Sequence, residues 1–202
     1  MSILISHYVL CLIGGYLLGS LPFGMIVTRL AGIGDLREIG SGNIGATNVL
    51  RTGNKALALA TLLLDSGKGA LAVLLAYLIF EEPDLLYYAG GGAFLGHLYP
   101  IYLKFRGGKG VATFLGTLLA INWLLGLFCC LTWLGATLIF RISSLSALLA
   151  SLMAPVYGFF IFENPKLALF SGLLCLMIFI RHQDNIKRLL SGTEPKIGKN
   201  AK

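Results

Sequence analysis

Residues 4–30 read LISHYVLCLIGGYLLGSLPFGMIVTRL, an apolar run too long for the core of an ordinary soluble protein. A helix that crosses the hydrocarbon core of a membrane needs roughly 20 such residues. Gly15 and Gly19 are spaced for close packing against another helix, and Pro22 stands where a membrane helix tolerates a kink. The run therefore predicts a first transmembrane helix. Because a positively charged signal-peptide region does not precede it, we expect this helix to be retained.

The composition extends this interpretation to the whole chain. Of the 202 residues, 56% are hydrophobic and 12% are charged, and the mean hydropathy is +0.82, which leaves too few polar groups to cover a water-soluble surface. The net charge of +7 does not indicate a nucleic-acid partner, because the basic residues are scattered at the ends of apolar segments. The four cysteines lack the spacing of a zinc site, so we expect neither a metal nor a disulfide.

The apolar runs predict an all-α polytopic membrane protein that forms a single domain, residues 1–202. We expect seven transmembrane helices, at about residues 4–30, 56–80, 85–103, 111–121, 123–140, 144–162 and 167–180. The fourth segment is short for a span, and Asn122 is its expected break from the fifth. A count of five or six spans is the alternative.

The loop charges predict the orientation of these helices. Fourteen of the sixteen Lys and Arg residues fall on one side of the predicted membrane, Lys166 falls on the other side, and Lys68 lies within a span. The positive-inside rule then places the N-terminus outside and the C-terminus in the cytoplasm. The polar tail from Arg181 to Lys202 and two glycine-rich loops, residues 40–51 and 107–110, fall on the cytoplasmic side.

Residues 40–51, GSGNIGATNVLR, follow the first helix and combine three glycines with small polar side chains. Glycines let the backbone approach a ligand and turn successive N–H groups toward an anion. Arg51 at the end of the stretch could bind the same anion through two hydrogen bonds. The stretch therefore predicts an anion site, and a polar turn between two membrane helices is the alternative.

A second glycine-rich loop, Gly107-Gly108-Lys109-Gly110, follows Lys104 and Arg106. It offers backbone donors and an ammonium group to a phosphate at the start of a helix. It is not a Walker A loop, because Gly110 stands where a magnesium-binding Ser or Thr is needed. A simple topology signal at a cytoplasmic boundary is the alternative.

Several ionisable residues lie in or beside predicted spans. Asp65 and Lys68 share one face of the second helix, and charges at membrane depth usually point into a functional cavity, although a structural ion pair is the alternative. His97 lies near the end of the third segment. His182 and Asn185 share a helical face after the seventh. None of the three histidines has an Asp five residues later, so the His-x4-Asp dyad of other acyltransferases is absent, and no Asp-rich metal signature is present.

Three stretches of the chain resemble the bacterial membrane glycerol-3-phosphate acyltransferases that use acyl phosphate. They are residues 40–51, then GHLYP at 96–100 continuing to FRGGKGVAT at 105–113, and finally Arg181-His182 with Asn185, Arg188, Leu189, Gly192 and Glu194. The Asp65-x-x-Lys68-Gly69 segment resembles this family as well.

The resemblance implies transfer of a fatty acyl group from acyl phosphate to the 1-hydroxyl of glycerol 3-phosphate, without a cofactor, a metal or an obligate protein partner. The active site would face the cytoplasm at the bacterial inner membrane. The catalytic residues implied are Ser41, Asn48, Arg51, Lys109, His182 and Asn185. The substrate-binding residues implied are Gly42, Asn43, Gly45, Thr47, Asp65, Lys68, His97, Lys104, Gly107, Gly108 and Gly110, and Glu194 would be structural.

Two mechanisms fit this reaction. The phosphate of the acyl phosphate could take the hydroxyl proton while Ser41, Asn48 and backbone N–H groups stabilise the oxyanion, or His182 could act as a general base.

A phosphate-ester transporter is the best non-enzyme alternative, but it predicts charges on both sides of a midplane site. A scaffold that binds anionic lipid would explain the basic loops but not Asn43 and Asn48.

Overall fold

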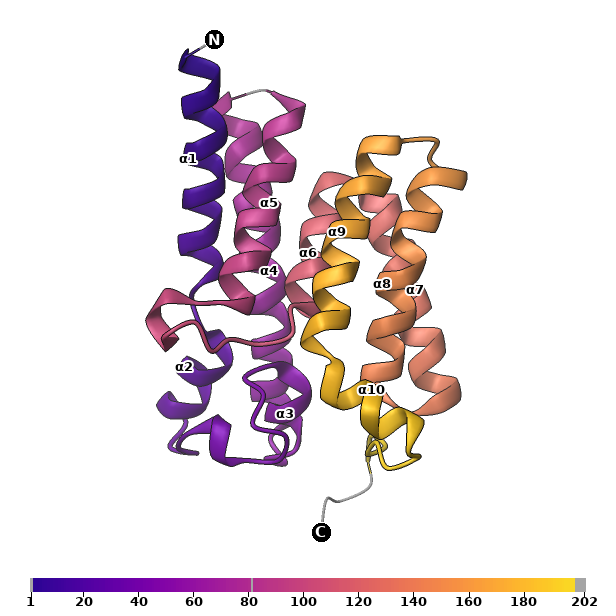
Figure 1. Cartoon of the computed structure of the whole chain (residues 1–202). Helices are drawn as coiled ribbons and strands as arrows, with labels where there is room; N and C mark the ends of the chain where they lie inside the picture. The colour runs from indigo at the N-terminus through magenta and orange to yellow at the C-terminus, as the bar shows by residue number, and fades with distance from the viewer. Residues whose placement is uncertain (1, 81, 199–202) are drawn as a thin grey trace. The chain divides into compact units, whose positions relative to one another are not determined.

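The computed structural model describes residues 2–80 and 82–198, and every regular element within them is a helix (Figure 1). Glu81, Lys199 and Lys202, which contribute to the net charge of the full sequence, lie outside the described residues. The chain divides into two compact units, Met1–Ile121 and Asn122–Lys202.

The first unit contains the longer helices and both glycine-rich loops. Its elements are α1 (Ser2–Gly19), α2 (Phe23–Leu30), η1 (Leu36–Glu38), α3 (Ala46–Leu50), α4 (Lys55–Phe80), α5 (Pro83–Leu98), η2 (Ile101–Leu103) and α6 (Val111–Ile121). At Pro22, where the sequence would tolerate a kink, the helix is interrupted between α1 and α2, because proline lacks the N–H group that would continue it.

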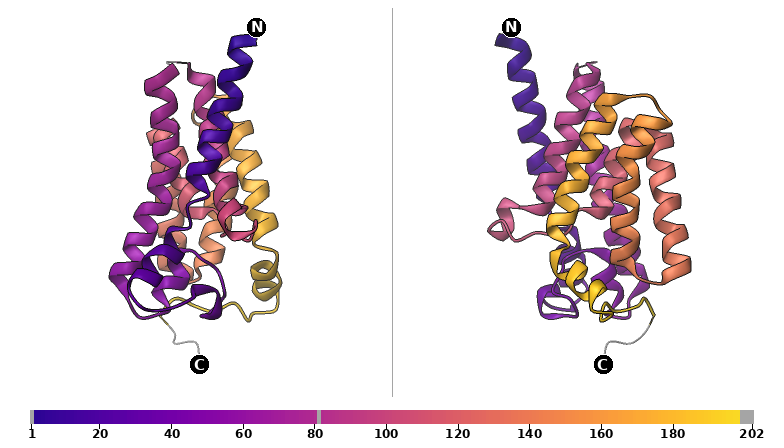
Figure 2. Two further views of the ribbon diagram at one scale, coloured as in Figure 1. Left: turned by 90° about the vertical axis from the view of Figure 1, so that its left-hand side faces the viewer. Right: turned by 45° about the vertical axis from the view of Figure 1, so that its right-hand side comes forward.

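The second unit consists of three antiparallel helices and a short amphipathic one, α7 (Trp123–Phe140), α8 (Ser143–Phe160), α9 (Pro165–Arg181) and α10 (Gln183–Leu190). Asn122 ends the preceding segment as expected, and its side chain accepts a hydrogen bond from Leu125 N at 2.9 Å to cap α7. Figure 2 shows α10 at the end of this unit where α7 passes into α8.

A helix therefore lies at each of the seven positions predicted from the sequence. By length and hydropathy, four segments of the described residues can cross a membrane, Ile5–Leu30, Lys55–Phe80, Trp123–Phe140 and Ser143–Phe160, and the α9–α10 pair, bent by 67°, would be a fifth. Helix α6, at 11 residues, is only about 16 Å long. The count of seven crossings stays a prediction.

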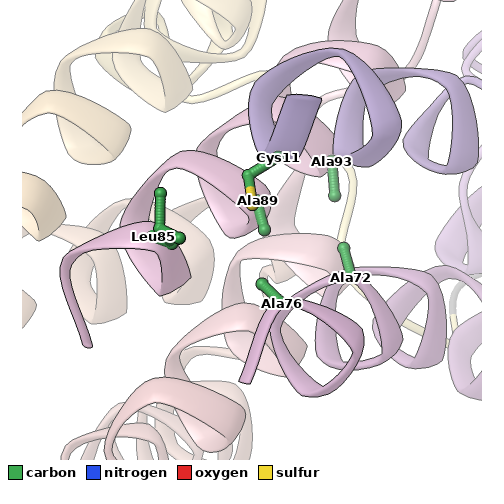
Figure 3. Close-up of a cluster of buried hydrophobic side chains, with 6 residues drawn as sticks. All are labelled: Cys11, Ala72, Ala76, Leu85, Ala89 and Ala93. Atoms are coloured by element: carbon green, nitrogen blue, oxygen red, sulfur yellow. The ribbon is translucent and has the colours of Figure 1, made fainter. Parts of the chain in front are cut away.

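Glycines let α1 and α5 pack at close range, as the spacing in the sequence predicted. A Cβ atom at Gly15 or Gly19 would overlap the main chain of α5, and one at Gly92 or Gly96 would overlap the main chain of α1. Small residues continue the seam toward α4, where Cys11, Ala72, Ala76, Leu85, Ala89 and Ala93 form a buried cluster (Figure 3). Such close approach increases the dispersion contacts between the helices, which matter in a membrane because the hydrophobic effect does not drive helices together there.

A second core supports the loop that precedes α4. Met25 of α2, Leu36 of η1, Ile44 and Val49 pack together with Ala58 of α4. Gly24 of α2 lies so close to this loop that a Cβ atom would overlap the carbonyl oxygen of Ile44. The polar stretch 40–51 is therefore held on α2 and α4 by its few apolar side chains.

Candidate active site

Asn48 organises the 40–51 loop from within. Its side chain is 1% exposed, and both hydrogens of Nδ2 are donated to carbonyl oxygens, to Leu36 at 3.1 Å and to Ile39 at 2.8 Å. Its Oδ1 accepts a hydrogen bond from Ser41 N at 3.0 Å and a longer one from Ser41 Oγ at 3.3 Å. This geometry favours a role for Asn48 in holding Ser41 over a direct role as an oxyanion donor.

The carbonyl groups that Asn48 binds belong to η1 and the residue that follows it, and Asp35 fixes their position. Asp35 Oδ1 accepts hydrogen bonds from the main chain and from Nε of Arg37, both at 2.9 Å. These bonds, with the charges of Arg37 and Arg29, lower the pKa of Asp35 to about 2. The carboxylate is therefore ionised at neutral pH and caps η1.

Ser41 follows Gly40 in the chain, the side chain of Arg51 lies next to Gly40, and both Ser41 and Arg51 are exposed. Gly40 has a φ of +57°, and a Cβ atom there would lie 2.5 Å from Asn48 Oδ1 and 2.9 Å from Arg51 Cδ. Only glycine suits this position, because a side chain would be strained and would displace both neighbours. The structure thus brings Ser41, Asn48 and Arg51 together around Gly40.

The other predicted residues of this loop form its rim. Gly42 has a φ of +68°, Asn43 and Gly45 are half-buried, and Thr47 is exposed on α3. None of these four residues is fully buried, which leaves the rim accessible to an anion.

Asp65, Lys68 and His97 form one buried cluster. Lys68 Nζ lies 2.8 Å from Asp65 Oδ1, and their side chains are 1% and 3% exposed. Lys68 also donates to the carbonyl oxygen of Leu21 at 2.8 Å, at the break between α1 and α2. His97 Nδ1, on α5, lies 3.6 Å from the same Asp65 oxygen.

The 107–110 loop folds back on the last turn of α5, next to this cluster. Gly107 N donates to Leu98 O at 3.2 Å, and Gly108 N donates to His97 O at 3.0 Å. These N–H groups, which we expected to bind a phosphate, thus hold the loop on α5. Lys109 is half-buried between them and Gly110, whereas Lys104 is exposed in a left-handed turn with a φ of +52°.

In the second unit, the carboxylate of Glu194 joins three donors. Its Oε1 accepts from Ser144 Oγ at 2.6 Å and from Asn185 Nδ2 at 2.5 Å, and its Oε2 accepts from Arg188 Nε at 2.6 Å. Burial raises the pKa of Glu194, but these three hydrogen bonds and the charge of Arg188 outweigh it and lower the pKa below the ordinary value of 4.5. The carboxylate ties the tail to α8 and α10, which agrees with the structural role that the sequence resemblance implied.

His182 stands at the junction of α9 and α10 and is 2% exposed. Its Nδ1 lies 2.8 Å from the carbonyl oxygen of Ile178. A carbonyl can only accept, so Nδ1 carries a proton and Nε2 is the basic nitrogen of the neutral ring. Asn185 lies in the first turn of α10, and His182 is the residue that precedes this helix. The shared face predicted for the two side chains stays a prediction.

Several partners of these residues were missed in the sequence, among them Leu21, Ser144 and Thr113, whose Oγ1 donates to the main-chain oxygen of Asp65 at 2.9 Å. Pro22 signalled that a nearby carbonyl would lose its helical partner, but it did not identify Lys68 as the replacement. Nothing in the sequence singled out Ser144, and Thr113 stood only as the last residue of the resembling stretch 105–113, without a role. Among residues 2–80 and 82–198, no group of three His, Cys, Asp or Glu side chains is placed to hold a metal ion.

The family model described as "Glycerol-3-phosphate acyltransferase" matches residues 9–192. A glycerol-3-phosphate acyltransferase of Cereibacter sphaeroides (strain ATCC 17025 / ATH 2.4.3) is 61% identical over 188 residues, which cover 93% of this chain and 88% of the relative. One of Dinoroseobacter shibae is 59% identical, with coverages of 94% and 93%.

Two crystal structures of PlsY (YgiH), an integral membrane glycerol 3-phosphate acyltransferase, share the fold. The glycerol 3-phosphate form is 38% identical, with a TM-score of 0.88 over 95% of this chain and 96% of that one. The lysophosphatidic acid form is 36% identical, with a TM-score of 0.86 and 95% coverage of both chains.

Proposed function

The chain belongs to the glycerol-3-phosphate acyltransferase family, and from this premise we propose that it transfers a fatty acyl group from acyl phosphate to the 1-hydroxyl of sn-glycerol 3-phosphate. The products are 1-acyl-glycerol 3-phosphate (lysophosphatidate) and inorganic phosphate. Membership of the family makes the chain an acyltransferase of phospholipid biosynthesis. The acyl-phosphate donor, the lysophosphatidate product and the residue roles below are the proposal.

One observation supports the choice of acceptor and product above the others. The fold agrees, over 95% of the chain, with a protein crystallised in a glycerol 3-phosphate form and a lysophosphatidic acid form. Both of those molecules carry a phosphate, and this chain presents exposed Ser41 and Arg51 on a glycine-rich loop. Donors and a cation in this arrangement suit a phosphate group.

In the first unit, we assign the phosphate contacts to Arg51, Lys109 and Ser41. Arg51 can present two parallel N–H donors to phosphate oxygens, and Lys109 can present a point charge. Asn48 sets the orientation of Ser41, so its role is to hold the loop. Gly42, Asn43, Gly45 and Thr47 would complete the rim, and Lys104 would add a further contact to phosphate.

In the second unit, we assign the recognition of glycerol 3-phosphate to His182 and Asn185. His182 Nε2 can accept a hydrogen bond from a glycerol hydroxyl, because Nδ1 is committed to Ile178. Asn185 is oriented by its hydrogen bond to Glu194. Both side chains are thus fixed before a substrate arrives, which lowers the entropy cost of positioning it.

The transfer itself requires one bond to form and one to break. The 1-hydroxyl oxygen attacks the acyl carbon, the bond from that carbon to the phosphate oxygen breaks, and the departing phosphate takes the hydroxyl proton. Ser41 and nearby backbone N–H groups would stabilise the charge that develops on the acyl oxygen. In this mechanism no side chain acts as a base, and positioning with electrostatic stabilisation supplies most of the rate.

The setting of this reaction is also part of the proposal. We assign the chain to the bacterial cytoplasmic membrane, with seven crossings, the N-terminus outside and the C-terminus in the cytoplasm. The excess of Lys and Arg in alternate loops supports this orientation. Both compact units would act together as one acyltransferase that needs neither a cofactor nor an obligate protein partner and whose substrates reach it from the cytoplasm and the membrane lipid.

The decisive experiment measures phosphate release and lysophosphatidate formation by the purified protein. Palmitoyl phosphate, palmitoyl-CoA and an acyl carrier protein thioester are offered separately with glycerol 3-phosphate. Formation of both products in equal amounts with palmitoyl phosphate, and with neither of the other two donors, would establish the donor. Arg51→Ala would serve as the inactive control. Product from a thioester would contradict the donor assignment, and saturable glycerol 3-phosphate binding without any product would favour a transporter.

A further inference from the structure

The segment that carries Lys109 is linked to Asp65 at both ends, indirectly through His97 at one end and directly through Thr113 at the other. Before Lys109, Gly108 lies against the ring of His97, whose Nδ1 is 3.6 Å from Asp65 Oδ1. After Lys109, Thr113 Oγ1 donates to the main-chain oxygen of Asp65 at 2.9 Å. One residue of α4 therefore holds the end of α5 and the start of α6, and the loop between them contains the lysine.

The charge of Asp65 is compensated within the protein. Lys68 lies 2.8 Å from it and is held in place by the carbonyl oxygen of Leu21, and the Lys68 ammonium also lies 5.7 Å from the centre of the Phe23 ring. A lysine that is 1% exposed and committed to these groups is poorly placed to reach a substrate phosphate. Its contacts instead keep the Asp65 carboxylate fixed beneath His97.

We propose that Asp65, Lys68 and His97 are positioning residues, which fix the direction of Lys109 through Gly108 and do not touch the substrate. This replaces the substrate-binding role that the sequence resemblance implied for these three residues. The inference rests on the proposed function, in which Lys109 binds a phosphate group of a substrate.

The two glycines before Lys109 allow a sharp test because they meet different parts of His97. A Cβ atom at Gly108 would overlap Nε2 of the His97 ring, and its next nearest atoms, at 3.0 and 3.1 Å, belong to the same ring. A Cβ atom at Gly107 would overlap the main-chain oxygen of His97 and would lie 2.6 Å from that of Leu98. Removing the ring therefore relieves the first clash and leaves the second.

The experiment measures kcat and KM for Gly107→Ala and Gly108→Ala, each in the wild-type and in the His97→Ala background. In the wild type we expect both substitutions to lower kcat/KM by about 100-fold, because they displace Lys109. In the His97→Ala background, Gly108→Ala should cost less than about 3-fold, whereas Gly107→Ala should keep its full cost. Gly67→Ala is the matched control, since a Cβ atom there has no other atom within 4 Å.

His97→Ala itself should lower kcat/KM by more than its loss of stability, measured as the thermal midpoint of unfolding, can explain. His97→Asn, which keeps a nitrogen facing Asp65, should recover part of the lost kcat/KM. Equal costs of Gly108→Ala in both backgrounds would overturn the inference, as would a His97→Ala variant whose kcat and KM are those of the wild type.

If the wild-type protein shows no turnover, the proposed function fails and hydrogen exchange decides this inference separately. Faster exchange of the amides of residues 107–113 in His97→Ala than in the wild type would support the positioning role. Unchanged exchange would overturn it.

Discussion

Lys68 Nζ donates a hydrogen bond of 2.8 Å to the carbonyl oxygen of Leu21, at the point where α1 and α2 separate. Pro22 follows Leu21, and the break it causes leaves carbonyl groups without a helical partner. In a membrane such groups are costly unless a neighbouring helix supplies a donor. Leu21 O accepts from Phe23 N at 3.1 Å, and the lysine on α4 supplies a second donor. The same ammonium balances the charge of Asp65.

Lys68→Met should therefore destabilise the protein strongly. The substitution leaves a buried carboxylate without its counter-charge, which costs about 3–5 kcal/mol. We expect the thermal midpoint of unfolding in detergent to fall by roughly 10 °C. Lys55→Met, at the exposed start of the same helix, should change stability by less than about 0.5 kcal/mol. Equal midpoints for the two variants would show that the buried pair does not stabilise the fold.

The glycine seam between α1 and α5 predicts a second contrast. Gly19→Ala should destabilise by about 1–3 kcal/mol, because its Cβ atom would overlap the main chain of Ala93 and push the helices apart. Gly14→Ala, one turn or so earlier on the same helix, meets no atom within 4 Å and should be neutral or slightly stabilising. Thermal unfolding of the two variants side by side checks this, and a Gly14→Ala loss as large as that of Gly19→Ala would contradict it.

Much of this fold could be predicted from the sequence because the membrane imposes long apolar runs. The start of α7 after Asn122 and the close contact at Gly15 and Gly19 follow from local chemistry that a sequence displays directly. The number of crossings does not, since α6 is short and α9 bends into α10. Whether such a helix spans a membrane depends on its neighbours as well as on its own residues.

Candidate site residues could be named from the sequence, but most of their contacts could not. Asp65 and Lys68 are three apart on one helix, so their pairing was foreseeable. The approach of His97 and Gly108 to the same place depends on how α4, α5 and α6 pack, which no local pattern encodes. The partners of Asn48 could not be foreseen either, because Leu36 and Ile39 contribute main-chain oxygens, which every residue has. From the sequence, Asn48 was therefore expected to act on the substrate.

Substitutions at Asn48 should separate loop holding from direct catalysis. Asn48→Asp keeps the oxygen that accepts from Ser41 but places a carboxylate oxygen against the carbonyl groups of Leu36 and Ile39, where Nδ2 now donates. We expect both Asn48→Asp and Asn48→Ala to lower stability by about 1–3 kcal/mol, with Asp the worse. Thermal unfolding and phosphate release measure the two effects. A variant that loses activity with unchanged stability would point to a direct role instead.

Glu194 predicts a pH-dependent attachment of the tail. Its pKa is lower in the folded protein than in the unfolded chain, so its stabilisation is complete above the unfolded pKa and is lost as the pH falls through the folded one. Glu194→Gln should cost about 1–3 kcal/mol at pH 7, and its difference from the wild type should shrink as the pH drops below about 4. Thermal midpoints across this range provide the measurement. Exposed Glu38→Gln is the control, and a difference that grows on acidification would contradict the assignment.

The role of His182 can be decided by a single conservative substitution. Since Nδ1 is held by Ile178 O, Nε2 is the atom that would either accept the proton of the glycerol hydroxyl or only orient that hydroxyl. His182→Gln keeps a polar side chain but has no basic nitrogen.

If the departing phosphate takes the proton, the His182→Gln variant should show a raised KM for glycerol 3-phosphate and, at saturation, a kcat within about 10-fold of the wild type. If His182 is the base, kcat should fall by about 100-fold or more even at saturation, because general-base catalysis contributes 10²–10⁴-fold. His182→Ala should add a larger KM effect in either case, because it also removes the contact that orients the hydroxyl.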